Sequence, residues 1–134
     1  MGEYLQNLAF DGGSIDRVTV NNRGPNDSLG NPGRFEGGDT AWMVDLKFGN
    51  TTLEKRWDWW LSAGYRYVES DAVIDGFTES DFGGGGTNLK GYTVAGALAL
   101  SKRFALGIRW MSAEEVAGPP FKNDILQIDL NGKF

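Results

Sequence analysis

The sequence predicts an all-β fold: an antiparallel transmembrane β-barrel segment of about six strands, joined as meander hairpins. Three observations lead to this prediction. Apolar and polar residues alternate along six segments of the 134-residue chain, as they do in strands with two different faces. Long and short connections follow one another between these segments, and aromatic residues gather at both ends of the apolar face, as in outer-membrane barrels.

The six expected strands cover residues 3–10, 41–49, 57–68, 91–101, 103–111 and 123–134. The second shows the alternation most clearly, with apolar Trp42, Val44, Leu46 and Phe48 at every second position. Most segments are nine to twelve residues long, which is long for a soluble strand. About 9–11 residues are what a tilted strand needs to cross a bilayer.

The connections differ in length and composition. Residues 11–40 and 69–90 form long loops rich in Gly, Asn and Asp, residues 112–122 a medium loop, and the remaining connections are short turns. Residues 15–20 (IDRVTV) are expected to form a short extra strand or a folded patch. The run DFGGGG at residues 81–86 is expected to be a flexible loop, because it lacks the GK[ST] ending of a phosphate-binding loop. The acidic long loops are expected to lie over a pore mouth.

Composition excludes several kinds of site. The chain has 20 glycines, 8 Phe, 5 Trp and 4 Tyr, a mixture typical of β structure with many turns. It has no Cys and no His, which excludes disulfides, thiolate or imidazole metal sites and Ser-His-Asp triads within this chain. The net charge of −5 argues against a nucleic-acid partner. We therefore predict no catalysed reaction, no metal site and no cofactor. For Asp71, Asp75, Glu79 and Asp81, a solvated acidic loop is favoured over a Ca²⁺ site.

The apolar face is predicted to carry two membrane girdles with aliphatic residues between them. Rings that are apolar in body and polar at the tip suit the two membrane–water interfaces. The girdle residues on the side of the short turns are Phe48, Trp57, Trp59, Phe104 and Phe134; those on the side of the long loops are Trp42, Tyr65, Tyr67, Tyr92 and Trp110. Alternation alone fits the core of a soluble sandwich equally well, so the girdles and the loop asymmetry favour the membrane.

The opposite face mixes charges of both signs with small polar groups, which suits a water-filled interior. The predicted pore-lining residues are Asp45, Lys47, Asp58, Arg66, Arg109 and Asp129. Because the two signs nearly balance, this face does not indicate anion or cation selectivity. Trp60 also faces this side and is a candidate for contact with a ligand.

Four stretches carry a resemblance to a known family: GEYLQNLAF, GDTAWMVDLKFG, WLSAGYRYVESDAVIDGFTESDFGGGGTNLKGY and the closing DLNGKF. The chain resembles the C-terminal portion of bacterial outer-membrane porins, in the group called putative porins. The resemblance implies residence in the bacterial outer membrane, contact with its lipid and lipopolysaccharide, and passive diffusion of small hydrophilic solutes. It also implies recognition of the last strand by the barrel-assembly machinery, through Leu126, Ile128, Leu130 and Phe134. Gly132 departs from the bulky residue often found two places before the end.

We expect residues 1–134 to be one unit and a fragment of a larger barrel. Six strands cannot enclose a pore, since even an eight-stranded barrel is filled by its own side chains, and open sheet edges are not tolerated in lipid. A homo-oligomer remains an option. Two alternatives stay open: a soluble β-sandwich or calyx that binds a sugar or lipid through its aromatics, and a non-conducting outer-membrane scaffold.

Overall fold

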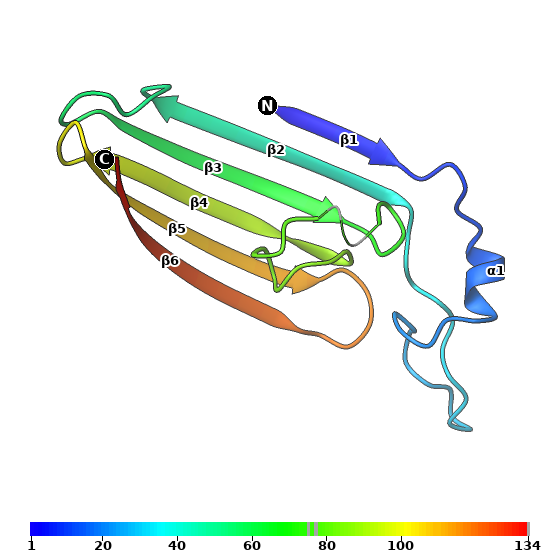
Figure 1. Ribbon diagram of the computed structural model, residues 1–134. Helices are drawn as coiled ribbons and strands as arrows, with labels where there is room; N and C mark the ends of the chain where they lie inside the picture. The colour runs from blue at the N-terminus through cyan, green and yellow to red at the C-terminus, as the bar shows by residue number, and fades with distance from the viewer. Residues whose placement is uncertain (75, 77, 134) are drawn as a thin grey trace.

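The computed structural model describes residues 1–74, 76 and 78–133. It is a single six-stranded sheet in the order β1-β2-β3-β4-β5-β6, in which each strand pairs antiparallel with the next along the chain (Figure 1). The elements are β1 (Gly2–Gln6), α1 (Gly12–Asp16), β2 (Thr40–Gly49), β3 (Trp59–Val68), β4 (Leu89–Ala99), β5 (Phe104–Glu115) and β6 (Lys122–Gly132). The all-β meander is confirmed. The sheet is open, with β1 and β6 at its edges.

Several element boundaries differ from the prediction for local reasons. β1 ends at Gln6, because the Asn7 side chain accepts a hydrogen bond from the Ala9 N–H and turns the chain. β3 begins at Trp59 rather than Trp57, whose φ of 74° is incompatible with a strand.

Residues 15–20 form no strand. Ile15 and Asp16 end helix α1, whose first turn is capped by the Asp11 carboxylate. Hydrogen bonds to its carboxylate lower the pKa of Asp11, and the one from the Ser14 hydroxyl has the largest effect.

The register gives the sheet two chemically distinct faces. Tyr65 of β3, for example, lies opposite Val44 of β2 and Tyr92 of β4, and its chain neighbour Arg66 points to the other side. We call one side the apolar face; it carries Trp42, Val44, Leu46, Phe48, Trp59, Leu61, Tyr65, Tyr67, Tyr92, Val94, Leu98, Phe104, Leu106, Ile108, Trp110, Leu126, Ile128 and Leu130. We call the other the polar face; it carries Asp45, Lys47, Ser62, Arg66, Thr93, Arg109, Gln127, Asp129 and Asn131.

Nothing in the described part of the chain covers the apolar face. Leu61, Leu106 and Ile128 in its middle expose 49%, 42% and 66% of their surface. Isolated exposed leucines are common, but a contiguous apolar patch across five strands marks a surface that contacts another apolar medium. A buried hydrophobic cluster lies instead on the opposite side, where the described residues of the loop between β3 and β4 fold back onto the sheet (Figure 1).

The connections lie at two ends of the sheet according to their length. Residues 50–58 and 100–103 form compact turns at one end, and residues 7–39, 69–88 and 116–121 form the longer loops at the other (Figure 1). In the first turn, the Asp58 carboxylate accepts hydrogen bonds from the N–H groups of Glu54 and Lys55. The predicted succession of long and short connections is therefore confirmed.

Asn88 joins the three long loops. Its side chain donates to the Ala117 carbonyl and accepts from the Ala117 N–H, at 2.8 and 3.0 Å. It also donates to the Asn22 side chain at 3.1 Å. Asn88 is buried, with a positive φ of 62° that Asn tolerates better than most residues.

Replacing Asn88 with Ala should separate these loops. The change leaves the buried N–H and carbonyl of Ala117 unpaired and should lower the free energy of unfolding by about 2–4 kcal/mol. Denaturant unfolding of the complete barrel in detergent micelles measures this loss, and limited proteolysis should show faster cleavage within residues 116–121. Asn26→Ala, at an exposed loop position, is the matched control. Equal stability of the two variants would contradict the role given to Asn88.

Candidate functional site on the polar face

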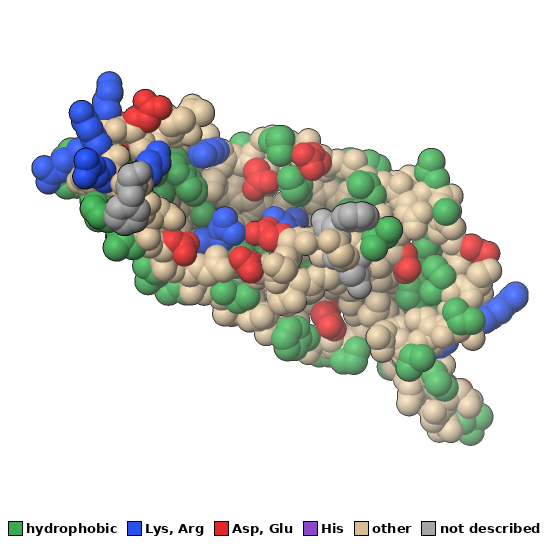
Figure 2. Space-filling model, viewed as in Figure 1, with side chains coloured by type: hydrophobic (Ala, Val, Ile, Leu, Met, Phe, Trp, Pro, Cys, Tyr) green, Lys and Arg blue, Asp and Glu red, His purple; other side chains and the backbone are tan. Residues whose placement is uncertain are grey.

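The polar face is built by alternate residues of five neighbouring strands. Arg66 of β3 and Arg109 of β5 lie on it, on either side of the small β4 residues Gly91 and Ala95. Because β4 contributes small side chains between them, the two guanidinium groups can reach the same partner. Figure 2 shows positive side chains in the middle of this face, with acidic ones beside them.

That partner comes from the loop between β3 and β4, whose described residues, 69–74, 76 and 78–88, we call the strap. Glu79 Oε2 lies 2.7 Å from Arg66 Nη2, and Glu79 Oε1 lies 3.0 Å from Arg109 Nη1. One carboxylate therefore bridges two strands that are not neighbours in the sheet. A third contact joins the strap to β6, where Gln127 Nε2 donates to Asp81 Oδ2 at 3.2 Å.

A hydrophobic anchor fixes the strap beside these polar contacts. Phe82 is 2% exposed and packs with Leu89, Met111 and Ala113. Its ring also lies beneath the Arg66 guanidinium, 4.5 Å from Arg66 Cζ to the ring centroid, a favourable cation–π geometry. The glycines that follow, Gly83 to Gly86, all have positive φ, which lets the chain turn tightly away from the anchor.

The structure adds contacts that the sequence did not predict for this loop. Phe82, within the run DFGGGG, packs on an apolar site of the sheet. Glu79 and Asp81 reach partners on three strands. Phe82 and Glu79 were missed as site residues. The available signal was an aromatic residue between an Asp and a run of glycines.

The predicted pore-lining residues fall into three groups. Arg66 and Arg109 are brought together by Glu79, as described. Asp45, Lys47 and Asp129 lie on the polar face away from that pair. Asp58 lies in the turn before β3, where its carboxylate caps the backbone. Their role as pore-lining residues remains a prediction.

Two local contacts shape the rest of the polar face. Lys47 Nζ lies 4.6 Å from the centroid of the Trp60 ring. A Cβ atom at Gly64 would overlap the Asp45 carboxylate, so the missing side chain of Gly64 leaves room for it. An aromatic ring, an ammonium group and a carboxylate thus lie on adjacent strands near the turn end of the sheet.

The predicted girdle residues lie at the two ends of the apolar face. Near the long loops, the Trp42 ring stacks with those of Tyr65 and Tyr67 at centroid distances of 5.5 and 6.0 Å. Tyr92 and Trp110 form a second pair at 5.0 Å. Phe48, Trp59 and Phe104 lie near the short turns, and Trp57 lies in the turn itself with the Arg56 guanidinium over its ring. Phe134 lies outside the described residues. The membrane role of all ten remains a prediction.

The predicted assembly signal falls on β6. Leu126, Ile128 and Leu130 all point to the apolar face and are strongly exposed. β6 pairs with β5 on one side, and its other edge has no strand beside it in the described structure. An exposed strand edge is suited to pairing with a further strand.

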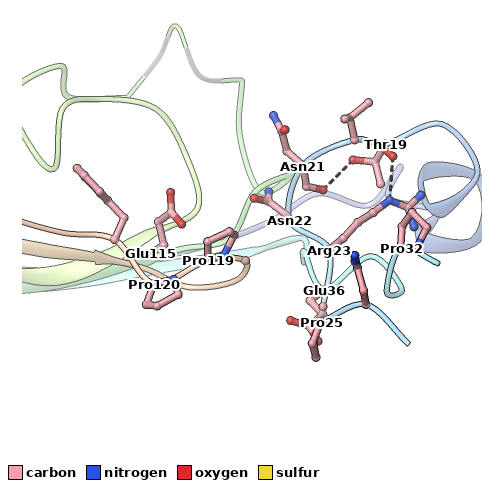
Figure 3. Close-up of a pocket in the computed structure, with 15 residues that line it drawn as sticks. Thr19, Asn21, Asn22, Arg23, Pro25, Pro32, Glu36, Glu115, Pro119 and Pro120 are labelled. Atoms are coloured by element: carbon pink, nitrogen blue, oxygen red, sulfur yellow. Dashed lines mark hydrogen bonds between the residues drawn. The ribbon is translucent and has the colours of Figure 1, made fainter. Parts of the chain in front are cut away.

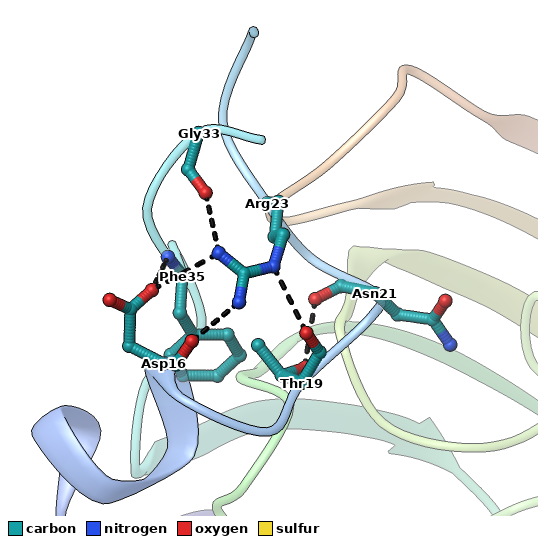
Figure 4. A network of polar contacts seen from close by, with 6 residues as sticks. All are labelled: Asp16, Thr19, Asn21, Arg23, Gly33 and Phe35. Atoms are coloured by element: carbon teal, nitrogen blue, oxygen red, sulfur yellow. Dashed lines mark hydrogen bonds and ion pairs between the residues drawn. The ribbon is translucent and has the colours of Figure 1, made fainter. Parts of the chain in front are cut away.

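The long N-terminal loop holds a groove beside the β5–β6 connection (Figure 3). The groove has a volume of about 1340 Å³ and is lined by residues of both loops, among them Asn22, Glu36 and Pro120. Arg23 organises the loop from within: its guanidinium donates to the carbonyls of Thr19 and Gly33 and pairs with Asp16 (Figure 4). Asp16 in turn accepts a hydrogen bond from the Phe35 N–H at 2.7 Å.

The acidic side chains of the strap do not gather into a cation site. Glu79 pairs with arginines, Asp81 with Gln127, and the Asp71 carboxylate accepts from the Ser70 hydroxyl. Within the residues that the structure describes, no three acidic side chains are grouped closely enough to hold a metal ion. Asp75, the fourth residue considered, lies outside them.

Comparison with known proteins gives one match. A family model described as "Putative porin" matches residues 1–134, the full length of the chain. No curated protein and no solved structure matches. Among the described residues, no helix has the length and hydropathy to cross a membrane.

Phe82→Ala should release the strap from the sheet. Removing a buried Phe side chain costs about 3–5 kcal/mol in well-packed sites. Hydrogen exchange followed by mass spectrometry should therefore show faster exchange in residues 78–88. Phe121→Ala, at a position 53% exposed, is the control and should leave exchange in the strap unchanged. If the strap exchanges at the same rate in both variants, Phe82 is not its anchor.

Proposed function

Because the chain belongs to the putative porin family, we propose that it forms part of the wall of a β-barrel in a bacterial outer membrane. Its polar face would line a water-filled path through which small hydrophilic solutes diffuse. The observation that carries the proposal is the two-faced sheet: one side is apolar and uncovered, and the other carries charges bridged by an inserted strap. The proposal involves no catalysed reaction.

The dimensions of the sheet support a membrane location. β2 to β6 are 10 to 12 residues long, and about 9–11 residues span a bilayer when the strand is tilted. Beyond the aromatic residues near the long loops, the apolar face ends in charged pairs. Lys90 Nζ lies 3.3 Å from Glu114 Oε1, and Lys122 Nζ lies 3.9 Å from Asp124 Oδ2. Such groups suit the headgroup region, where lipid and lipopolysaccharide would be the neighbours.

The open edges of β1 and β6 require partners under this proposal. Unpaired backbone N–H and carbonyl groups are costly in hydrocarbon, so a membrane sheet closes on itself. Further strands, from the same chain in a longer protein or from other copies, would complete the barrel. We also propose that β6 is the strand read by the barrel-assembly machinery, through Leu126, Ile128 and Leu130.

The strap places acidic side chains opposite basic side chains of the polar face. Glu79 and Asp81 enter from the strap, and Arg66 and Arg109 stand on the wall. A permeating ion would pass these groups within a few ångströms, where the effect of charge on its energy is largest. The solute would then be selected by charge at the level of Glu79.

Charge reversal at Arg66 and Arg109 tests this function. We expect R66E/R109E to raise the ratio of cation to anion permeability at least tenfold, because each reversal changes the local charge by two units and a unit charge about 5 Å from an ion in water contributes about 0.8 kcal/mol. Reversal potentials in planar bilayers measure the ratio, with the complete barrel reconstituted. R34E/R103E, at two exposed loop and turn positions, controls for net charge. Unchanged selectivity would remove Arg66 and Arg109 from the narrow part of the path. A correctly inserted barrel without conductance would instead favour the non-conducting scaffold.

A further inference from the structure

We propose that Arg66 and Arg109 form a binding site for the carboxylate of a small solute with an apolar body, and that Glu79 occupies this site in the solute's absence. This inference rests on the proposed function, because it places the solute on the polar face. It adds the class of solute that the site would take, an aromatic or short aliphatic monocarboxylate.

The geometry around Glu79 is that of a bound carboxylate. Each of its two oxygens contacts a different guanidinium, at 2.7 and 3.0 Å, within the range of charge-assisted hydrogen bonds. The carboxylate of a solute placed there would make the same two contacts. The site is therefore already built for this group, and the strap supplies the group from within the chain.

The carboxylate of a solute can replace that of Glu79 at little cost in free energy. The side chains of Arg66, Arg109 and Glu79 expose 26%, 40% and 35% of their surface, so water and solutes reach them. Partly exposed ion pairs contribute little to stability. Exchange also keeps both arginines paired, and the released Glu79 side chain returns to water. Two guanidinium groups and one carboxylate leave one positive charge, which attracts a second anion.

The space beside the pair indicates what the rest of the solute is like. A cavity of about 270 Å³ reaches Arg66 and Glu79, and its walls include Leu5, Met43, Val73, Phe82 and Leu89. These apolar side chains suit a ring or a short alkyl chain, whereas an inorganic anion would leave them in contact with water. Glu3 also lines the cavity. Its negative charge would repel a second carboxylate, so a monocarboxylate fits better than a dicarboxylate.

Benzoate is a suitable probe, and equilibrium binding is the readout. Isothermal titration of the complete barrel in detergent micelles should show benzoate binding, and benzyl alcohol, which has the same ring without the charge, should bind much more weakly. E79Q should tighten benzoate binding roughly tenfold, because it removes the competing carboxylate and leaves both arginines. R109Q should weaken it roughly tenfold. E54Q makes the same change of charge at an exposed turn residue and should have no such effect.

The outcomes separate this inference from the proposed function. If E79Q alters benzoate affinity no more than E54Q does, or if benzyl alcohol binds as tightly as benzoate, the carboxylate site is refuted. Either result leaves the conductance proposal standing. A barrel that binds benzoate in this pattern but does not conduct would overturn the proposed function and keep the site.

Discussion

A sheet of a single layer must place both of its faces in suitable surroundings. Side chains alternate with a period of two, so fixing Tyr65 on one side fixes Arg66 on the other across every paired strand. In a soluble sandwich the apolar side would meet a second layer. Here the strap covers the opposite side, and Leu61, Leu106 and Ile128 stay uncovered. Hydrocarbon on one side and water on the other satisfy both faces without further protein on the apolar one.

The same alternation explains where the strap is attached. Towards the short turns, the positions of the polar face other than Trp60 are charged or small, as at Lys47 and Ala97. Towards the long loops they become apolar, at Leu89, Met111 and Ala113, and form the surface on which Phe82 packs. Anchored there, the strap brings Glu79 over the arginine pair. The apolar residues at this end of the polar face therefore position the strap, and with it the charged site.

The sequence predicted the fold well because strand periodicity is a local property that needs no knowledge of distant contacts. It placed Trp42 and Leu46 on one face and Arg66 and Arg109 on the other, as the register confirms. It could not predict the strap, since Phe82 and Glu79 find their partners far along the chain. It also misplaced two strand ends, at Asn7, whose side chain turns the chain, and at Trp57, whose φ is positive.

Site-directed spin labelling along β5 tests the central claim most directly. Residues 1–134 contain no cysteine, so once any cysteine elsewhere in the barrel is replaced, each introduced label has one position. With the barrel reconstituted in liposomes, labels at positions 106 and 108 should be relaxed mainly by oxygen, which concentrates in hydrocarbon. Labels at positions 107 and 109 should be relaxed mainly by a water-soluble nickel chelate. Collisions with the nickel chelate at all four positions, or protection of 106 and 108 from both reagents, would show that the apolar face does not contact lipid.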